Sequence, residues 1–136
     1  GMGRTAGSFP LTFSPSNRSG GFISDQTQAS VGHVTETIHI DTLDHFMETR
    51  SAHTIHFIKI DVEGFEAHVI DGGVKTLQKH QPVVVMELNH WCLNAFQRTS
   101  IPDFFDKLLS SFPFVYAIEG QNYLDVRDAN ERYIVM

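Results

Sequence analysis

The 136-residue sequence predicts an α/β domain in which helices cover a sheet with parallel central strands. Two segments, 54–62 and 82–88, are apolar at neighbouring positions, as strands are when both faces of a parallel sheet are covered. The segment between them has apolar residues at helical spacing, so strand, helix and strand predict a right-handed βαβ unit. The later segments also alternate between helix and strand, which supports the same fold class.

The elements before the first central strand are weaker. Residues 1–30 are rich in Gly, Ser, Thr, Pro and Asn and carry only isolated apolar residues, which indicates an irregular arm or a weak edge hairpin. Residues 31–40 alternate between apolar and polar positions, which predicts a half-buried strand. A short helix is expected over 43–47, with Asp41 or Thr42 as its N-terminal cap.

After the first central strand, glycine breaks and helix-capping residues predict where the elements begin and end. A helical segment over 65–79 is interrupted by Gly72 and Gly73, which mark a kink or a division into two short helices. Ser100, with Asp103 three residues later, is a plausible capping box for the next helix. Strands are then expected over 114–118, 123–126 and 132–136, the last two as an antiparallel edge.

Composition argues against several classes of function. The net charge is −6 with the eight histidines neutral, and Lys and Arg form no cluster, so a nucleic-acid partner is not expected. No apolar run approaches the roughly 20 residues of a membrane span, and the first residues lack the apolar core of a signal peptide. Cys92 is the single cysteine and is expected to be unreactive. We therefore expect a cytoplasmic protein, with Gly1 as a cleavage scar and Met2 as the native start.

Side chains with oxygen ends follow both central strands at the point where each strand ends. Asp61 and Glu63 follow the first strand, and Glu87 and Asn89 follow the second. Because the carboxyl ends of parallel strands meet at one edge of a sheet, we expect these four side chains on one rim. Lys59 lies on an otherwise apolar strand, so its ammonium group needs a carboxylate, and Asp61 is the nearest candidate along the chain.

Structural explanations of the same residues stay open. Asp61 and Glu63 could be acids that stabilise the positive end of the following helix. Gly64 could simply permit a tight turn from strand to helix. Glu87 could be a satisfied polar end of a buried strand, and the segment that begins at His90 could be ordinary loop packing.

The segment 58–66 reads Ile-Lys-Ile-Asp-Val-Glu-Gly-Phe-Glu and resembles the signature Ile-Lys-Ile-Asp-Val-Glu-Gly-x-Glu of FkbM-type methyltransferases. The resemblance covers about residues 34–136 and is strongest from 54 to 89. We therefore divide the chain into the arm of residues 1–30 and a partial FkbM-like domain over 31–136. Further pieces that agree in order and spacing are Thr42-Leu43-Asp44, Gly72-Gly73 with Leu77, and Pro82-Val83-Val84-Val85-Met86-Glu87.

The resemblance implies an incomplete class I methyltransferase sheet, which is Rossmann-like, with an antiparallel C-terminal edge and helices on its faces. It implies S-adenosylmethionine as cofactor and methyl transfer to an oxygen of a sugar or another small molecule. Asp61 and Lys59 would bind the cofactor, and Asp61, Glu63 and Glu87 would be catalytic, with Asp61 or Glu63 able to take the hydroxyl proton. The acceptor-binding residues would be Asn89 and His90.

No metal is assigned to the site, although a divalent ion that bridges Asp61, Glu87 and Asn89 is an alternative, because hard cations take oxygen ligands. The glycine-rich loop Asp/Glu-x-Gly-x-x-x-Gly and the ribose-binding acid of class I enzymes are missing from the sequence. The strand at 54–62 would then have an open edge and an uncovered apolar face. The arm, a second copy in a homodimer or another polypeptide could cover it. The alternative function is a non-catalytic remnant that acts as a dimeric binding module.

Overall fold

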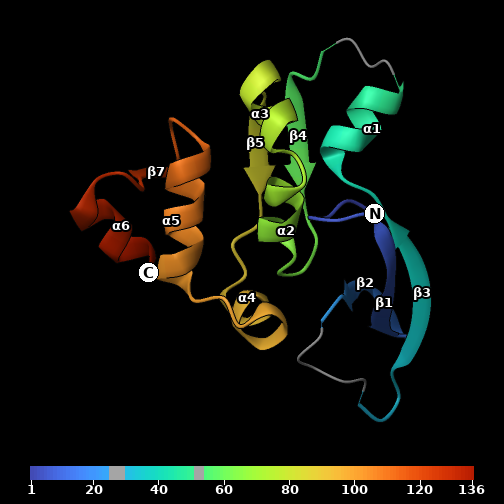
Figure 1. Ribbon diagram of the computed structural model, residues 1–136. Helices are drawn as coiled ribbons and strands as arrows, with labels where there is room; N and C mark the ends of the chain where they lie inside the picture. The colour runs from blue at the N-terminus through green and yellow to red at the C-terminus, as the bar shows by residue number, and fades with distance from the viewer. Residues whose placement is uncertain (25–29, 51–53) are drawn as a thin grey trace. The chain divides into compact units, whose positions relative to one another are not determined.

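The computed structural model describes residues 1–24, 30–50 and 54–136, and within these residues the chain is mixed α/β, which confirms the broad fold class (Figure 1). The chain divides into two compact units, Gly1–Arg98 and Thr99–Met136. None of the described helices has the length and apolar character needed to cross a bilayer.

The first unit begins with an antiparallel sheet of β1 (Gly7–Ser14), β2 (Asn17–Phe22) and β3 (Val34–Ile40), in the order β2-β1-β3. The part of residues 1–30 that the structure describes is therefore a hairpin and not an irregular arm; residues 25–29 lie outside the described residues. The signal was a short alternation of Phe9, Leu11 and Phe13, which gives β1 the period of a strand.

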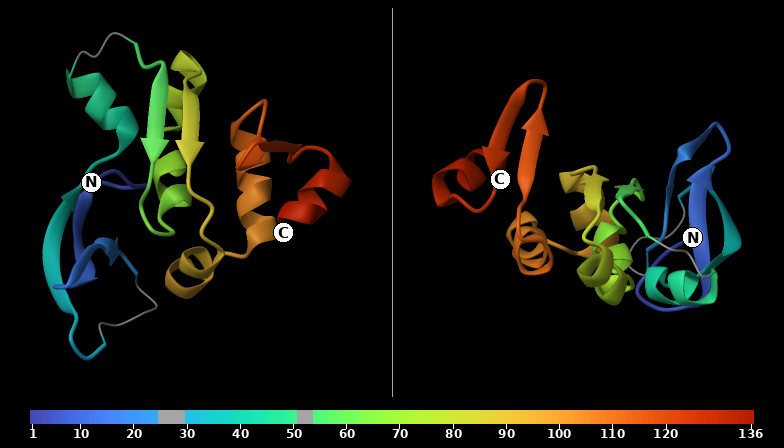
Figure 2. Two further views of the ribbon diagram at one scale, coloured as in Figure 1. Left: turned by 180° about the vertical axis from the view of Figure 1, so that it is seen from behind. Right: turned by 90° about the horizontal axis from the view of Figure 1, so that it is seen from above.

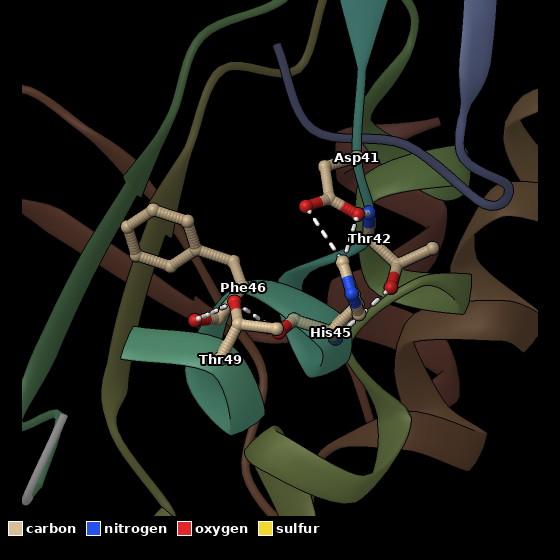
Figure 3. A network of polar contacts seen from close by, with 5 residues as sticks. All are labelled: Asp41, Thr42, His45, Phe46 and Thr49. Atoms are coloured by element: carbon tan, nitrogen blue, oxygen red, sulfur yellow. Dashed lines mark hydrogen bonds and ion pairs between the residues drawn. The ribbon is translucent and has the colours of Figure 1, made fainter. Parts of the chain in front are cut away.

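The helix α1 (Leu43–Arg50) begins where the sequence predicts, but it extends three residues further than 43–47. Thr42 is the cap, because its Oγ1 accepts a hydrogen bond from the His45 backbone N–H at 3.1 Å. Figure 3 shows the contacts around this start: Asp41 faces the His45 ring, and the Thr49 hydroxyl donates to the His45 carbonyl at 2.9 Å.

The central strands β4 (Phe57–Ile60) and β5 (Val83–Met86) pair in parallel, with Ile60 opposite Met86. The connection holds two helices, α2 (Glu66–Asp71) and α3 (Val74–His80), so Gly72 and Gly73 divide the predicted helix in two. Figures 1 and 2 show both helices on one face of the β4–β5 pair.

The apolar pattern of these strands is typical of burial on both faces, but one apolar face is uncovered, as expected for an incomplete sheet. Ile60 is 4% exposed on the helix-covered face, whereas Phe57 is 60% and Val83 is 63% exposed on the other face. Both strands are apolar at neighbouring positions, as the sequence pattern required, but α2 and α3 cover only one side of the pair. The apolar pattern shows which side chains of a strand are suited to burial. Whether they are buried depends on which faces of the sheet other elements cover.

The Thr-Leu-Asp segment and the glycine pair, about 30 residues apart, form one structural unit. The Asp44 carboxylate accepts hydrogen bonds from the backbone N–H groups of Lys75 (3.1 Å) and Thr76 (2.8 Å), so it caps the start of α3. The Asp44 N–H donates to the Gly72 carbonyl at 2.9 Å. A Cβ atom at Gly72 would lie 1.9 Å from the Gly3 carbonyl oxygen, so only glycine fits there.

The residues after β5 form a helix, α4 (His90–Gln97), and not the loop considered from the sequence. Asn89 is its N-cap, since the Asn89 Oδ1 accepts from the Cys92 N–H at 3.1 Å. The apolar positions Leu93 and Phe96 are buried, and the helix ends at Arg98, which has a left-handed backbone with φ of 53°. An asparagine cap before apolar residues at helical spacing was the signal for this helix.

The second unit begins with α5 (Ile101–Ser111), whose cap is the predicted Ser100. The Ser100 hydroxyl accepts from the Asp103 N–H and donates to the Asp103 carboxylate at 2.6 Å. At the other end of α5, the Arg127 guanidinium donates to the carbonyl oxygens of Leu109, Phe112 and Pro113. Carbonyls in the last turn of a helix lack intrahelical donors, and Arg127 supplies donors there and to the two residues that follow α5.

The C-terminal strand prediction is wrong. Residues 132–136 fall mainly within the helix α6 (Ala129–Val135), which Asp128 caps by accepting from the N–H groups of Asn130 and Glu131. The antiparallel edge is instead the hairpin of β6 (Tyr116–Glu119) and β7 (Asn122–Asp125). An aspartate that bonds two successive N–H groups favours a helix over the β-branched propensity of Ile134 and Val135.

Candidate functional site

The acids predicted from the sequence lie together at the carboxyl ends of β4 and β5. Ile60 pairs with Met86, so Asp61 and Glu87, which follow them, continue a matched pair. One carboxylate oxygen from each of Asp61, Glu63 and Glu87 lies within 4.8 Å of the others. The parallel register therefore brings together side chains that are about 25 residues apart in sequence.

Lys59 binds the cluster as expected, with its Nζ 2.8 Å from Asp61 Oδ2. The hydrogen bond from the Lys59 ammonium to Asp61 raises the pKa of Lys59, and the nearby charge of Glu87 acts in the same direction. Alternation along the strand places Lys59 and Asp61 on the exposed face of the β4–β5 pair, beside Val85 and Glu87 on β5. The group of four charged side chains is thus open to a ligand from that face.

Glu63 reaches the cluster from an unusual backbone position. Glu63 has φ of 50° and Gly64 has φ of 94°, so two successive residues adopt left-handed conformations. The Gly64 N–H donates at 3.3 Å to Oε1 of Glu66, which is only 2% exposed. Burial raises the pKa of the Glu66 carboxyl, while backbone groups around Gly64 partly offset this effect.

The first-turn acid of α2 is Glu66, and not Asp61 or Glu63. The explanation of Asp61 and Glu63 as helix N-terminal acids therefore does not describe their positions, since both precede the turn that leads into α2. Gly64 does permit a tight turn, as the structural explanation held. It also allows close contact, because a Cβ atom there would lie 2.7 Å from the Cys92 carbonyl oxygen.

Cys92 contacts Glu63, and nothing in the sequence indicated this contact. Its Sγ donates a hydrogen bond to Glu63 Oε2 at 3.2 Å, and the residue is 4% exposed. Burial first, and then the hydrogen bond to Glu63, raise the pKa of the Cys92 thiol to about 12. The thiol is therefore protonated at neutral pH and unsuited to nucleophilic attack, in accord with the expectation of an unreactive cysteine.

The predicted acceptor-binding residues take different positions. The Asn89 side-chain oxygen caps α4, so its amide nitrogen is the part of that side chain that can still donate to a ligand. His90 is the first residue of α4 and is exposed. The metal alternative had assigned the Asn89 oxygen to an ion, and the structure gives that oxygen to the Cys92 N–H.

The arrangement suits cationic or hydroxyl ligands. Three carboxylates face one ammonium group, so negative charge predominates at the rim. Oxygen atoms at this spacing could hydrogen-bond a hydroxyl group, attract a positively charged group or share a divalent cation, which takes oxygen ligands at about 2.0–2.6 Å.

A separate pocket of about 190 Å³ lies elsewhere in the first unit, between the hairpin, α2 and α4. Its lining includes Phe9, Phe65 and His68, and the Phe65 and His68 rings stack with centroids 4.2 Å apart. None of the residues predicted for catalysis, cofactor or acceptor binding lines this pocket. The candidate site is therefore the open rim of the central strands and not this cavity.

Comparison with known protein families gives one result. The model of the methyltransferase FkbM domain matches residues 2–124, which include the N-terminal hairpin as well as the central strands. Comparisons with curated proteins and with solved structures found no match. Methyl transfer is the activity that defines this domain. The match spans most of the sequence and agrees with the signature at 58–66, and the chain belongs to the FkbM methyltransferase domain family.

Proposed function

We propose that this domain takes part in S-adenosylmethionine-dependent methyl transfer to a hydroxyl group of a sugar or another small molecule. The observation that carries the proposal is the carboxylate cluster of Asp61, Glu63 and Glu87 at the ends of two parallel strands. Ligands of parallel α/β sheets bind at this edge, and the cluster places three carboxylates there.

Different residues of the cluster can remove the proton and orient the acceptor. Bound S-adenosylmethionine supplies an electrophilic methyl group on a positively charged sulfur. Asp61 or Glu63 would take the proton of the acceptor hydroxyl as that oxygen is methylated. Glu87 and the Asn89 amide nitrogen orient the acceptor, together with His90, and Lys59 holds Asp61 in place.

The donor chemistry of the rim fits the positive end of the cofactor, because carboxylates attract a sulfonium and an ammonium group. Asp61 and Lys59 are the cofactor-binding residues in this proposal, with Lys59 as the partner of the cofactor carboxylate. The adenosine end needs a glycine-rich loop, and no such loop is present in the printed sequence. We therefore propose that β4 and β5 belong to a larger Rossmann-like class I sheet whose cofactor loop comes from other residues or from another polypeptide.

Isothermal titration with S-adenosylmethionine tests the proposal. Because the glycine-rich loop is missing, we expect the isolated chain to bind only weakly. Asp61→Asn should weaken this binding about tenfold or more, since loss of one charge-assisted contact costs about 1.5–3 kcal/mol. Asp106→Asn, which changes an exposed aspartate on α5, is the matched control and should bind like the parent chain. Equal binding by Asp61→Asn and the parent would contradict the assigned site. Absence of binding would favour the interaction-module alternative.

We also propose that a second copy of the chain covers the apolar part of the exposed face of β4 and β5 and leaves the acids at the carboxyl ends of the strands open to ligand. Within the described residues the N-terminal strands form their own sheet and do not pair with β4, so they do not extend the central pair. Phe57, Val83 and Val85 are exposed on the face that α2 and α3 leave uncovered. The cytoplasm stays the expected compartment, on the basis of a single buried cysteine.

A further inference from the structure

The Glu63 carboxylate is held by a residue of another element. Cys92 lies in the first turn of α4, and its Sγ donates to Glu63 Oε2 at 3.2 Å. Within the family signature Glu63 is followed by Gly64, and the contact reaches it from a residue 29 positions later.

We propose that Cys92 is a positioning residue that fixes the Glu63 side chain for its part in the rim cluster. The thiol binds one carboxylate oxygen, Oε2, and the Oε1 atom is left without a thiol bond. A neutral donor suits this task, because it orients the carboxylate without cancelling its negative charge. This inference rests on the proposed function for its purpose, while the contact itself can be measured without any methyl transfer.

Backbone contacts support the same assignment. The Gly64 position approaches the first turn of α4 so closely that a Cβ atom would lie 2.7 Å from the Cys92 carbonyl oxygen. On its other side, the Gly64 N–H donates to the buried Glu66 carboxylate. The left-handed turn at Glu63 and Gly64 is therefore held between α4 and the start of α2, and Glu63 leaves it in a fixed direction.

Cys92 is itself anchored by the N-terminal hairpin. It belongs to a buried cluster with Phe22 of β2 and Phe96 of α4. The Phe22 and Phe96 rings stack with centroids 3.8 Å apart and planes within 5°. A chain of contacts thus runs from β2 through α4 to Glu63, and it gives the hairpin a role in ordering the rim.

Infrared spectroscopy tests the contact directly, since Cys92 is the single cysteine and gives the single S–H stretching band. A thiol that donates to a carboxylate has a band at lower frequency than a free thiol. We expect Glu63→Ala to move the band to higher frequency and Glu63→Gln to move it part of the way. Glu87→Ala, which changes another acid of the same cluster, should leave the band in place. A band unmoved in Glu63→Ala would overturn the proposal.

Side-chain NMR couplings test the positioning effect. We expect the χ1 couplings of Glu63 to report one rotamer in the parent chain and averaged rotamers in Cys92→Ala. Cys92→Ser keeps a donor and should restore the single rotamer, which a loss of packing alone would not do. Unchanged Glu63 couplings in Cys92→Ala would refute the role of the thiol. Failure to bind S-adenosylmethionine would count against the proposed function and would leave both of these measurements intact.

Discussion

Asp41 and Asp44 lie three residues apart at the start of α1, and each bonds a different part of the chain. Asp41, two residues before α1, faces the ring of His45 in the first turn of that helix (Figure 3). Asp44 reaches across to α3 and bonds two of its backbone N–H groups. The first contact is local and exposed, whereas the second joins elements about 30 residues apart, so their loss should have different consequences.

Asp44→Ala should destabilise the first unit by about 1–2 kcal/mol, because two N–H groups at the start of α3 lose their acceptor. Urea unfolding followed by the fluorescence of Trp91, the single tryptophan, measures the loss. Glu48→Ala on the same helix is the control. Glu48 makes an exposed ion pair with Lys75 at 3.7 Å, so its loss should change stability by less than about 1 kcal/mol. Equal effects would refute the capping role.

Asp41 should titrate below its ordinary pKa of 3.8, because the hydrogen bond from His45, followed by that from the Thr42 N–H, stabilises the charged carboxylate. A lowered acid pKa means that this contribution to stability is present above pH 3.8 and is lost as the pH falls through the lower folded-state pKa. A carboxyl-carbon NMR titration measures the midpoint. His45→Gln should raise the midpoint and Thr49→Ala should not. A midpoint unaffected by His45→Gln would contradict the assignment.

At the scale of elements, the turn between β4 and α2 determines where the rim acids lie. Gly64 has φ of 94° and Gly32 has φ of 91°, but a Cβ atom at Gly32 would meet nothing within 4 Å. The two glycines therefore share one backbone conformation and differ in crowding. Comparing them separates the cost of the left-handed backbone from the cost of contact with α4.

Gly32→Ala should cost about 1 kcal/mol, the usual penalty of a side chain in this backbone region. Gly64→Ala should cost about 1–3 kcal/mol more, because its Cβ atom meets the Cys92 backbone and the first turn of α4 must shift. Urea unfolding of both variants gives the difference. Equal losses would show that α4 moves aside freely and that the close contact has no energetic weight.

Elements whose residue pattern and cap agree could be predicted from the sequence, and an element whose cap opposes its intrinsic propensity could not. The break at Gly72 and the Ser100 cap follow from local chemistry, and both were found. The helix at the C-terminus was missed because Ile134 and Val135 favour strands, while the deciding contact is the Asp128 cap. Tertiary context set the exposure of β4, which its own apolar pattern does not record.

The candidate site likewise contains residues that the sequence could place and residues that it could not. Asp61, Glu63 and Glu87 could be placed together from the parallel order of two strands, without coordinates. Cys92 could not, since a thiol contact between α4 and a turn 29 residues earlier leaves no periodic signal. The position of Asn89 at a strand end follows from the sequence, but its role does not, because its oxygen caps a helix.

At the scale of the whole molecule, the exposed apolar face of β4 and β5 is the feature that needs a partner. Phe57 and Val83 are both at least 60% exposed, and they pair with each other in register. Adjacent apolar side chains on an uncovered sheet face are a common mark of a protein interface. The other face of the same pair is already covered by α2 and α3.

Val85→Lys should convert a dimer of this chain to a monomer, because it places a charge in the middle of the exposed face. Size-exclusion chromatography with light scattering gives the mass directly. Val74→Lys on α3, where Val74 is 43% exposed, is the control and should leave the mass unchanged. A parent chain that stays monomeric at all concentrations would refute the homodimer.

The glycine at position 72 constrains sequence change far from itself. The Gly3 carbonyl oxygen occupies the space that a side chain at 72 would fill, so the two positions cannot vary independently. Relatives with a larger residue at 72 are expected to carry an altered backbone path, or a different number of residues, ahead of β1. Covariation between the start of the domain and the end of α2 should therefore be visible in an alignment of relatives.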